Sequence, residues 1–158
     1  MKTNFLIPHR YKKLGWFILI PSTIIGLLVT IYDFEPEILN LKVPALFIDE
    51  FMGEKKNIGF TENNWMNEIM GILIIISSMM VAFSKETIED EFISKIRLES
   101  LAWSVYFNQA VLLISILFIY DLAFFWVMIF NMFALLWFFI IRFTYLKNKL
   151  QILPENEE

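Results

Sequence analysis

Four apolar runs, separated by polar segments, dominate the pattern of the chain. Each run is about 20 residues long, and a helix of that length, at about 1.5 Å per residue, matches a hydrocarbon layer of about 30 Å. The runs cover residues 14–32, 65–83, 101–120 and 122–141. We therefore predict an all-α, polytopic membrane protein: a four-helix transmembrane bundle that forms a single domain over residues 1–153, with a disordered tail at 154–158.

The first run carries a proline and a stripe of small residues. Pro21 lies within the run and predicts a kink, because proline removes one helical hydrogen bond. Ser22, Gly26 and Thr30 recur every four residues, and such a stripe allows a second helix to approach closely. We expect the stripe to pack within one chain, with a contact between two copies as the alternative.

The segment between the first two runs, residues 33–64, is the one long loop. Within it, residues 43–52 have Pro44 where a helix would have its first turn and place four apolar side chains on one helical face. These side chains are Phe47, Ile48, Phe51 and Met52. Because the segment is too short to span, we predict an interfacial helix at the outer surface that covers the helix ends, with ligand binding as an alternative role.

The segment KETIEDEFISKIRLES, residues 85–100, is the strongly charged part of the second half of the chain. Thr87 can cap a helix that starts near Ile88 and has acidic residues in its first turn. Continued to residue 120, this third helix would be about 50 Å long, which is about 20 Å more than the membrane takes up. We therefore predict a cytoplasmic extension of the third helix.

The predicted extension presents two ridges. The charged ridge consists of Glu91, Lys95 and Glu99, which can pair at a spacing of four residues. The apolar ridge has the same spacing and consists of Ile88, Phe92 and Ile96. An exposed apolar ridge needs a cover. The N-terminal leader, the end of the fourth run, the lipid surface, a second copy and a separate protein can each supply one.

Few polar side chains fall inside the predicted spans. We expect the serine, asparagine and glutamine side chains to form hydrogen bonds between helices, with a polar pathway as the alternative. The one acid, Glu68, has two interpretations: an acid in the first turn of a helix, where the helix dipole favours it, or a functional buried carboxylate. The residues are Glu68, Ser77, Ser78, Asn108, Gln109 and Asn131.

The distribution of positive charge predicts the orientation. The chain has 13 Lys and Arg residues, and the long loop holds three of them, Lys42, Lys55 and Lys56. By the positive-inside rule this loop faces outward, and four spans return the chain to the side on which it starts. We therefore predict a protein of the bacterial inner (cytoplasmic) membrane with both termini in the cytoplasm.

The composition of the chain argues against several kinds of functional site. The chain is 58% hydrophobic, has a net charge of -4, contains no cysteine and has a single histidine, His9. The negative charge argues against direct binding of nucleic acid, and one chain cannot build a zinc site of His and Cys type or a Ser-His-Asp triad. The five glycines are too scattered for a phosphate-binding loop. We therefore expect a protein that is not an enzyme and that needs no cofactor or metal.

Two stretches have a familiar pattern of charged and aromatic positions, SKETIEDEFISKIRLESLAW and YDLAFFWVMIFNMF. They resemble a group of small, uncharacterised four-span inner-membrane proteins from Bacteroidota. The similarity covers most of residues 12–146 and rests on overall pattern, not on a catalytic motif. Such proteins are often encoded beside small helix-turn-helix regulators, so the resemblance implies a membrane-side partner for a cytoplasmic regulatory protein.

These observations favour a non-enzymatic signalling or interaction protein that lies in the lipid bilayer and contacts a cytoplasmic partner through residues 87–100. The alternative is a subunit of a small transporter or channel, which would form a homo-oligomer. The candidate partner-binding residues are Glu89, Asp90, Glu91, Lys95, Arg97 and Glu99.

Overall fold

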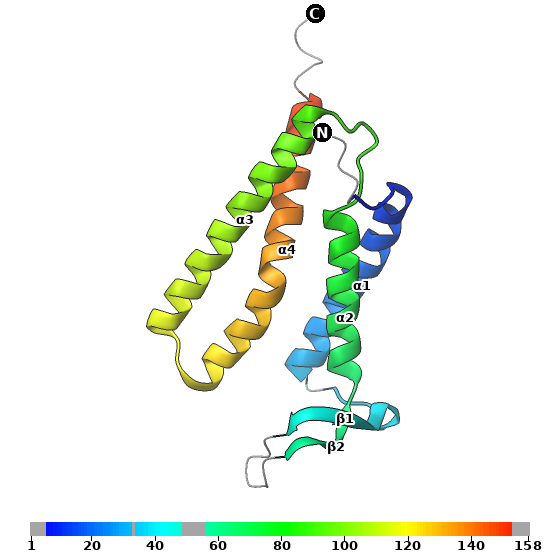
Figure 1. The fold of residues 1–158 in the computed structure, drawn as a ribbon, viewed down its shortest axis with the longest axis vertical. Helices are drawn as coiled ribbons and strands as arrows, with labels where there is room; N and C mark the ends of the chain where they lie inside the picture. The colour runs from blue at the N-terminus through cyan, green and yellow to red at the C-terminus, as the bar shows by residue number, and fades with distance from the viewer. Residues whose placement is uncertain (1–5, 33, 49–55, 153–158) are drawn as a thin grey trace, which may run out of the picture. The chain divides into compact units, whose positions relative to one another are not determined.

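The computed structural model describes residues 6–32, 34–48 and 56–152, and these residues are mostly helical (Figure 1). The described residues form four α-helices, a short 3-10 turn and two strands. In order, they are α1 Arg10–Tyr32, a 3-10 turn η1 Glu37–Leu39, β1 Asn40–Ile48, β2 Lys56–Asn64, α2 Met66–Ala82, α3 Glu91–Phe118 and α4 Asp121–Ile152.

The prediction of a mostly helical chain with helices suited to a membrane is confirmed. The helices α1, α3 and α4 are each long and apolar enough to cross a bilayer, and α2 is a shorter apolar helix of 17 residues. Large apolar side chains lie on the outer surface of these helices, among them Phe17 and Leu122, each 78% exposed. Exposing such a surface to water costs free energy, and contact with lipid removes this cost.

The chain divides into two compact units, which we describe separately. The first unit comprises the described parts of Met1–Leu19 and Ile75–Glu158, and the second comprises those of Ile20–Ile74. The core of the first unit is aromatic. Phe139 is fully buried and stacks between Phe83 and Phe143, with ring centroids 5.9 and 5.8 Å away.

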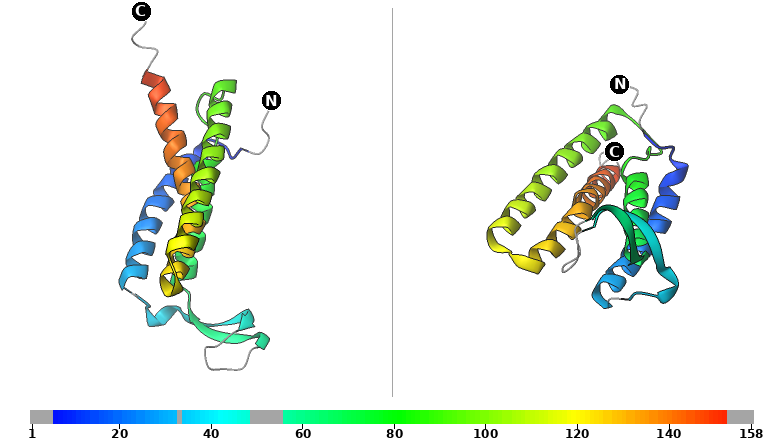
Figure 2. Two further views of the ribbon diagram at one scale, coloured as in Figure 1. Left: turned by 90° about the vertical axis from the view of Figure 1, so that its left-hand side faces the viewer. Right: turned by 60° about the horizontal axis from the view of Figure 1, so that its bottom comes forward.

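In the first unit, α3 and α4 are antiparallel and pack side by side (Figures 1 and 2). The turn between them has only residues 119–120, in keeping with the single residue that separates the predicted runs 101–120 and 122–141. Asp121 has a positive φ of 56°, a conformation that Asp tolerates better than most residues. The buried face of α3 carries small polar side chains that allow close packing. They are Ser100, Ser104, Asn108 and Ser115.

Within the first unit α1 and α2 approach each other at Gly15. A Cβ added to Gly15 would lie 2.9 Å from Val81 Cγ2, 3.1 Å from Met80 Cβ and 3.2 Å from the carbonyl oxygen of Ser77. These atoms belong to the backbone or lie next to it, so they cannot move away easily. The absence of a side chain at position 15 therefore determines how closely the two helices pack.

In the second unit, the same two helices meet at Gly26, a member of the predicted small-residue stripe. A Cβ at Gly26 would lie 3.3 Å from Ile74 Cδ1 and 3.6 Å from Met70 Cβ, and Ser22 is buried one turn away. The stripe thus packs within one chain, as expected. The contact is looser than at Gly15, because the nearest atom is the end of a flexible side chain.

The loop of the second unit forms a hairpin, so the predicted interfacial helix is wrong over residues 43–48; residues 49–52 lie outside the described residues. The strands β1 and β2 are antiparallel, with pairs running from Asn40↔Asn64 to Ile48↔Lys56. A short apolar run suits a helix or a strand equally well. The strand forms here because residues 56–64 pair with residues 40–48 and supply backbone hydrogen bonds between the two strands. Pro44 is acceptable because β1 is an edge strand.

One buried side chain attaches the hairpin to α2. Asn64 Nδ2 donates to the carbonyl of Pro36 at 2.9 Å and to Asn40 Oδ1 at 2.6 Å. Its Oδ1 accepts from the backbone N–H of Met66 at 3.1 Å, so it satisfies a donor at the start of α2. The Trp65 N–H adds a bond of 3.1 Å to the carbonyl of Leu39. Asn64 thus holds the base of the hairpin and the first turn of α2 together.

The two glycine contacts predict different responses to alanine. Gly15→Ala should lower the free energy of unfolding by about 1–3 kcal/mol, the usual cost of overpacking. Gly26→Ala should be close to neutral, because the gain of about 0.5–1 kcal/mol from replacing a helical glycine offsets a small adjustment of Ile74. Thermal unfolding of both variants in the same detergent checks this. Equal losses in the two variants would contradict the difference in packing.

Candidate functional site

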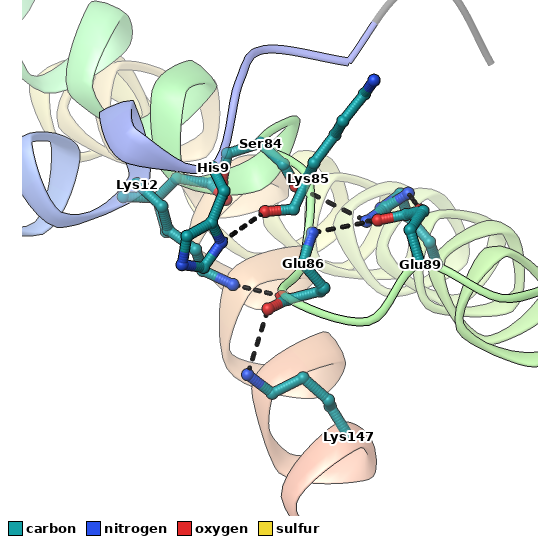
Figure 3. Close-up of polar contacts among 9 residues, drawn as sticks. His9, Lys12, Ser84, Lys85, Glu86, Glu89 and Lys147 are labelled. Atoms are coloured by element: carbon teal, nitrogen blue, oxygen red, sulfur yellow. Dashed lines mark hydrogen bonds and ion pairs between the residues drawn. The ribbon is translucent and has the colours of Figure 1, made fainter.

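The segment after α2 is attached to the residues that precede α1. The N–H of Ile7 donates to the carbonyl of Phe83 at 2.9 Å, and the N–H of Lys85 donates to the carbonyl of Ile7 at 2.8 Å. His9 Nδ1 donates to the carbonyl of Lys85 at 2.8 Å (Figure 3). The chain therefore leaves α2 beside the start of α1 and is held there by backbone bonds.

The carboxylate of Glu86 lies between two lysines from different helices. Its side chain is only 6% exposed. Oε1 accepts from Lys12 of α1, and Oε2 lies 3.3 Å from Nζ of Lys147 of α4 (Figure 3). A buried carboxylate needs such partners, because an uncompensated buried charge is very costly. Glu86 thus joins the loop to the first and the last helix.

Glu89, three residues later, makes the matching contact with α3. Arg97 Nη1 donates to Glu89 Oε1 at 2.5 Å and Nη2 to Glu89 Oε2 at 3.1 Å, a two-point contact that orients both groups. The Arg97 guanidinium also lies 5.2 Å from the ring centre of Phe143 on α4. The backbone N–H of Glu86 donates to Glu89 Oε2 at 2.9 Å, which links the Glu89 carboxylate to the loop backbone at Glu86.

We call these five residues the charge cluster: Lys12, Glu86, Glu89, Arg97 and Lys147. Burial by itself would raise the pKa of Glu86, but the hydrogen bond from Lys12 and the charges of Lys12 and Lys147 outweigh it and hold the pKa below its ordinary value. Burial would likewise raise the pKa of Glu89, and the bonds from Arg97 and from the Glu86 N–H outweigh it, so its pKa is also lowered. Both carboxylates are therefore ionised at neutral pH.

The structure assigns the predicted partner-binding residues to different roles. Glu89 and Arg97 face each other inside the charge cluster. Asp90 caps α3, because its side chain accepts from the N–H of Ile93 at 2.7 Å. Glu99 pairs with Arg142 of α4 at 3.4 Å. Glu91 and Lys95 remain exposed.

The predicted start of α3 is wrong. Asp90 caps the helix in place of Thr87, and α3 begins at Glu91 instead of near Ile88. Asp90 succeeds because the Arg97–Glu89 pair holds residue 89 outside the helix, so the first helical turn can form only after it. The 28 residues of α3 span about 42 Å. This exceeds a hydrocarbon layer of about 30 Å by roughly 12 Å instead of the expected 20 Å.

The predicted apolar ridge is covered at one position only. Ile96 is buried, whereas Ile88 is 71% and Phe92 is 53% exposed. Leu98, which the ridge did not include, is 70% exposed. We call the outward side of this region the exposed face; it consists of Ile88, Glu91, Phe92, Lys95 and Leu98.

Of the polar residues predicted within the spans, Asn108 and Asn131 come together. Asn108 Nδ2 donates to Asn131 Oδ1 at 3.3 Å, and Asn131 Nδ2 donates to the Asn108 carbonyl at 3.5 Å. Asn108 and Asn131 therefore form the expected hydrogen bond between helices. Ser77 and Ser78 are both buried in α2. Gln109 is exposed.

Glu68 lies at the other end of α2, in the second unit. Its side chain is exposed and accepts from Asn63 Nδ2 at 2.5 Å. It stands in the first turn of α2, where the helix dipole favours an acid. The first-turn explanation for Glu68 therefore fits its position, and nothing in its surroundings resembles a buried acid.

Sequence reasoning missed Lys12, Glu86 and Lys147 as partners. A signal was present: each lies just beyond an apolar run, and the predicted topology puts these three run ends on one side of the membrane. What the pattern could not supply is the pairing, because Glu86 is separated from its partners by 74 and 61 residues.

Within the part of the chain that the structure describes, no group of three or more His, Cys, Asp or Glu side chains could hold a metal ion. Comparison with protein-family models, with curated proteins and with solved structures finds no match for this chain. The resemblance based on sequence pattern stays a prediction.

Removal of the Glu86 carboxylate should destabilise the protein at neutral pH. Glu86→Gln leaves Lys12 and Lys147 without a negative partner. We expect a loss of about 3 kcal/mol in the free energy of unfolding, the lower end of the range for a broken buried pair, because both lysines keep some contact with water. The matched control is Glu62→Gln, whose exposed pair with Lys42 should contribute less than about 1 kcal/mol. Equal effects of the two changes on thermal unfolding would contradict the burial of Glu86.

The lowered carboxylate pKa values predict loss of stability in acid. A group whose pKa is lower in the folded state stabilises fully above its unfolded pKa and loses this contribution as the pH falls through the folded pKa. Stability should therefore fall progressively as the pH drops through about 4.3, where an unperturbed Glu is half protonated. Glu86→Gln should show a shallower fall over this window in a series of thermal unfolding measurements. An identical fall in the variant would show that Glu86 is not a source of the acid sensitivity.

Proposed function

We propose that this protein is a non-enzymatic signalling or interaction protein of the bacterial inner membrane, which presents the exposed face to a cytoplasmic partner. The observation that supports this most directly is the combination of a buried charge cluster with an uncovered surface beside it. The cluster fixes the start of α3, and the neighbouring residues Ile88, Phe92 and Leu98 stay exposed. An apolar group mixed with charges, at a helix end beyond the lipid, suits a protein contact.

The contacts between the helix ends support four crossings if α1 crosses the membrane. Residues 83–85, after α2, bond to Ile7 and His9, before α1. A chain that crosses in α1 must therefore have returned by residue 83, so α2 crosses as well. Flanked by Trp65 and Phe83, the 17 residues of α2 are close to the required length. Lys147 brings the end of α4 to the same place.

The proposed orientation in the membrane is inferred from the positions of the Lys and Arg residues. The residues that surround the cluster include additional cations, such as Arg10, Lys13 and Lys149, while the hairpin side carries Lys42 paired with Glu62. By the positive-inside rule, we infer that the cluster faces the cytoplasm and that the hairpin faces outward. With this orientation, the resemblance to four-span inner-membrane proteins suggests a cytoplasmic regulatory protein as the partner.

The transporter alternative has less support. A polar pathway needs side chains that continue from one side of the membrane to the other. In the described residues Asn108 and Asn131 bond to each other, and Glu68 bonds to Asn63 of the hairpin. Hydrogen bonds between α3 and α4 account for the asparagines without a transported substrate.

The proposal predicts that changes on the exposed face remove a partner without unfolding the protein. Phe92→Ala combined with Lys95→Glu should reduce copurification of a cytoplasmic protein by tenfold or more, the effect of losing at least 1.4 kcal/mol. Lys42→Glu on the hairpin is the matched control, since that side faces outward in the proposed orientation.

Thermal unfolding of each variant separates lost binding from lost structure, because neither Phe92 nor Lys95 is buried. Arg97 is unsuitable for this experiment, since its removal would break the charge cluster. Unchanged copurification from a stable double variant would contradict the proposed surface.

A further inference from the structure

Gln109 is a polar side chain on the outer surface of a membrane-spanning helix. It lies near the middle of α3, which is one of the three helices long and apolar enough to cross a bilayer. Its side chain is exposed. In the part of the chain that the structure describes, no hydrogen bond reaches its side-chain amide.

Hydrocarbon is a poor environment for such an amide. A primary amide has two N–H donors and an acceptor oxygen, and none of them finds a partner among lipid tails. The neighbouring residue finds an acceptor for its amide N–H within the chain, because Asn108 Nδ2 donates to Asn131 Oδ1 of α4. Adjacent helical residues point about 100° apart, so Gln109 cannot share this arrangement. The Gln109 amide therefore needs a hydrogen-bond partner from outside the chain.

The surface around Gln109 has the pattern of a helix–helix contact. Ala102, Gln109 and Ile116 recur every seven residues, and Val105 and Leu112 fall between them at alternating steps of three and four. Ala102, Val105, Gln109 and Ile116 are exposed. This spacing keeps one line of side chains facing a partner helix in a left-handed pair. We call this line the α3 seam.

We propose that the α3 seam binds the α3 seam of a second copy, with a hydrogen bond between the two Gln109 side chains. An amide is its own complement, because the donor of one copy meets the acceptor of the other across a two-fold axis. Both copies have the same orientation in the membrane, so the helices are parallel and each residue meets its own equivalent. The small side chain of Ala102 allows the helices to approach.

This inference does not depend on the proposed function. It concerns the lipid-facing middle of α3, whereas the exposed face lies at the start of that helix. Pairing along the seam would, however, bring two copies of Leu98 near each other, since Leu98 continues the seam at a step of four from Ala102.

Cysteine cross-linking tests the seam directly, because the chain contains no cysteine. Ala102→Cys and Ile116→Cys should each give a disulfide-linked species of twice the chain mass when native membranes are oxidised. The matched control is Ile114→Cys, which is also exposed on α3 but points about 140° away from Gln109. It should remain at the mass of one chain.

The role of the amide is tested in the same backgrounds. Gln109→Leu should reduce the cross-linked fraction at a low protein-to-lipid ratio. The same change should weaken self-association about tenfold, as measured by energy transfer between labelled copies. Gln109→Asn keeps the amide and should retain most of the association. Because position 109 is exposed, thermal unfolding of the leucine variant should be unchanged when measured on the separated single chain.

Three results would overturn the proposal. Absence of cross-linking at both seam positions would exclude the contact. Equal cross-linking at Ile114 would show random collision instead of a defined surface. A product whose added mass differs from that of this chain would identify a different protein as the occupant of the seam.

Discussion

The buried carboxylate of Glu86 is where three separate parts of the chain meet. A negative charge with little access to water is stable only beside positive partners, and here they come from the first and the last helix. Backbone bonds to Ile7 and the Glu89–Arg97 pair surround it and add the start of α3. The same contacts therefore determine which helix ends lie together, where α3 begins and which side chains stay free for other partners.

Lipid as the solvent explains how the remaining polar groups are arranged. Helices gain little from burying apolar side chains against each other when lipid tails are equally apolar, so close packing and hydrogen bonds must hold them. The contact at Gly15, the small polar face of α3 and the Asn108–Asn131 pair each serve this purpose. Gln109 is exposed on α3, and no hydrogen bond reaches its amide in the described residues, which is why it points to a second copy.

The sequence predicted the parts of the structure that depend on local pattern. Run lengths located the four helices, the short gap between the last two runs located the tight turn, and the stripe at Gly26 located a helix contact. The hairpin was missed because the choice between helix and strand for residues 43–48 depends on a partner strand that begins at Lys56. The cap at Asp90 and the pairing of Glu86 were missed for a related reason: both depend on distant side chains, Arg97 in one case and Lys12 and Lys147 in the other.

The central claim is that the charge cluster holds the ends of all four helices on one side of the membrane. Labelling of single cysteines by a membrane-impermeant maleimide in intact cells tests it most directly, with exposed positions Lys13, Lys85 and Lys149 near the cluster and Glu62 on the hairpin. The account predicts that Glu62→Cys is labelled in intact cells and that the other three are labelled only after permeabilisation. A different labelling result at position 85 than at positions 13 and 149 would contradict it.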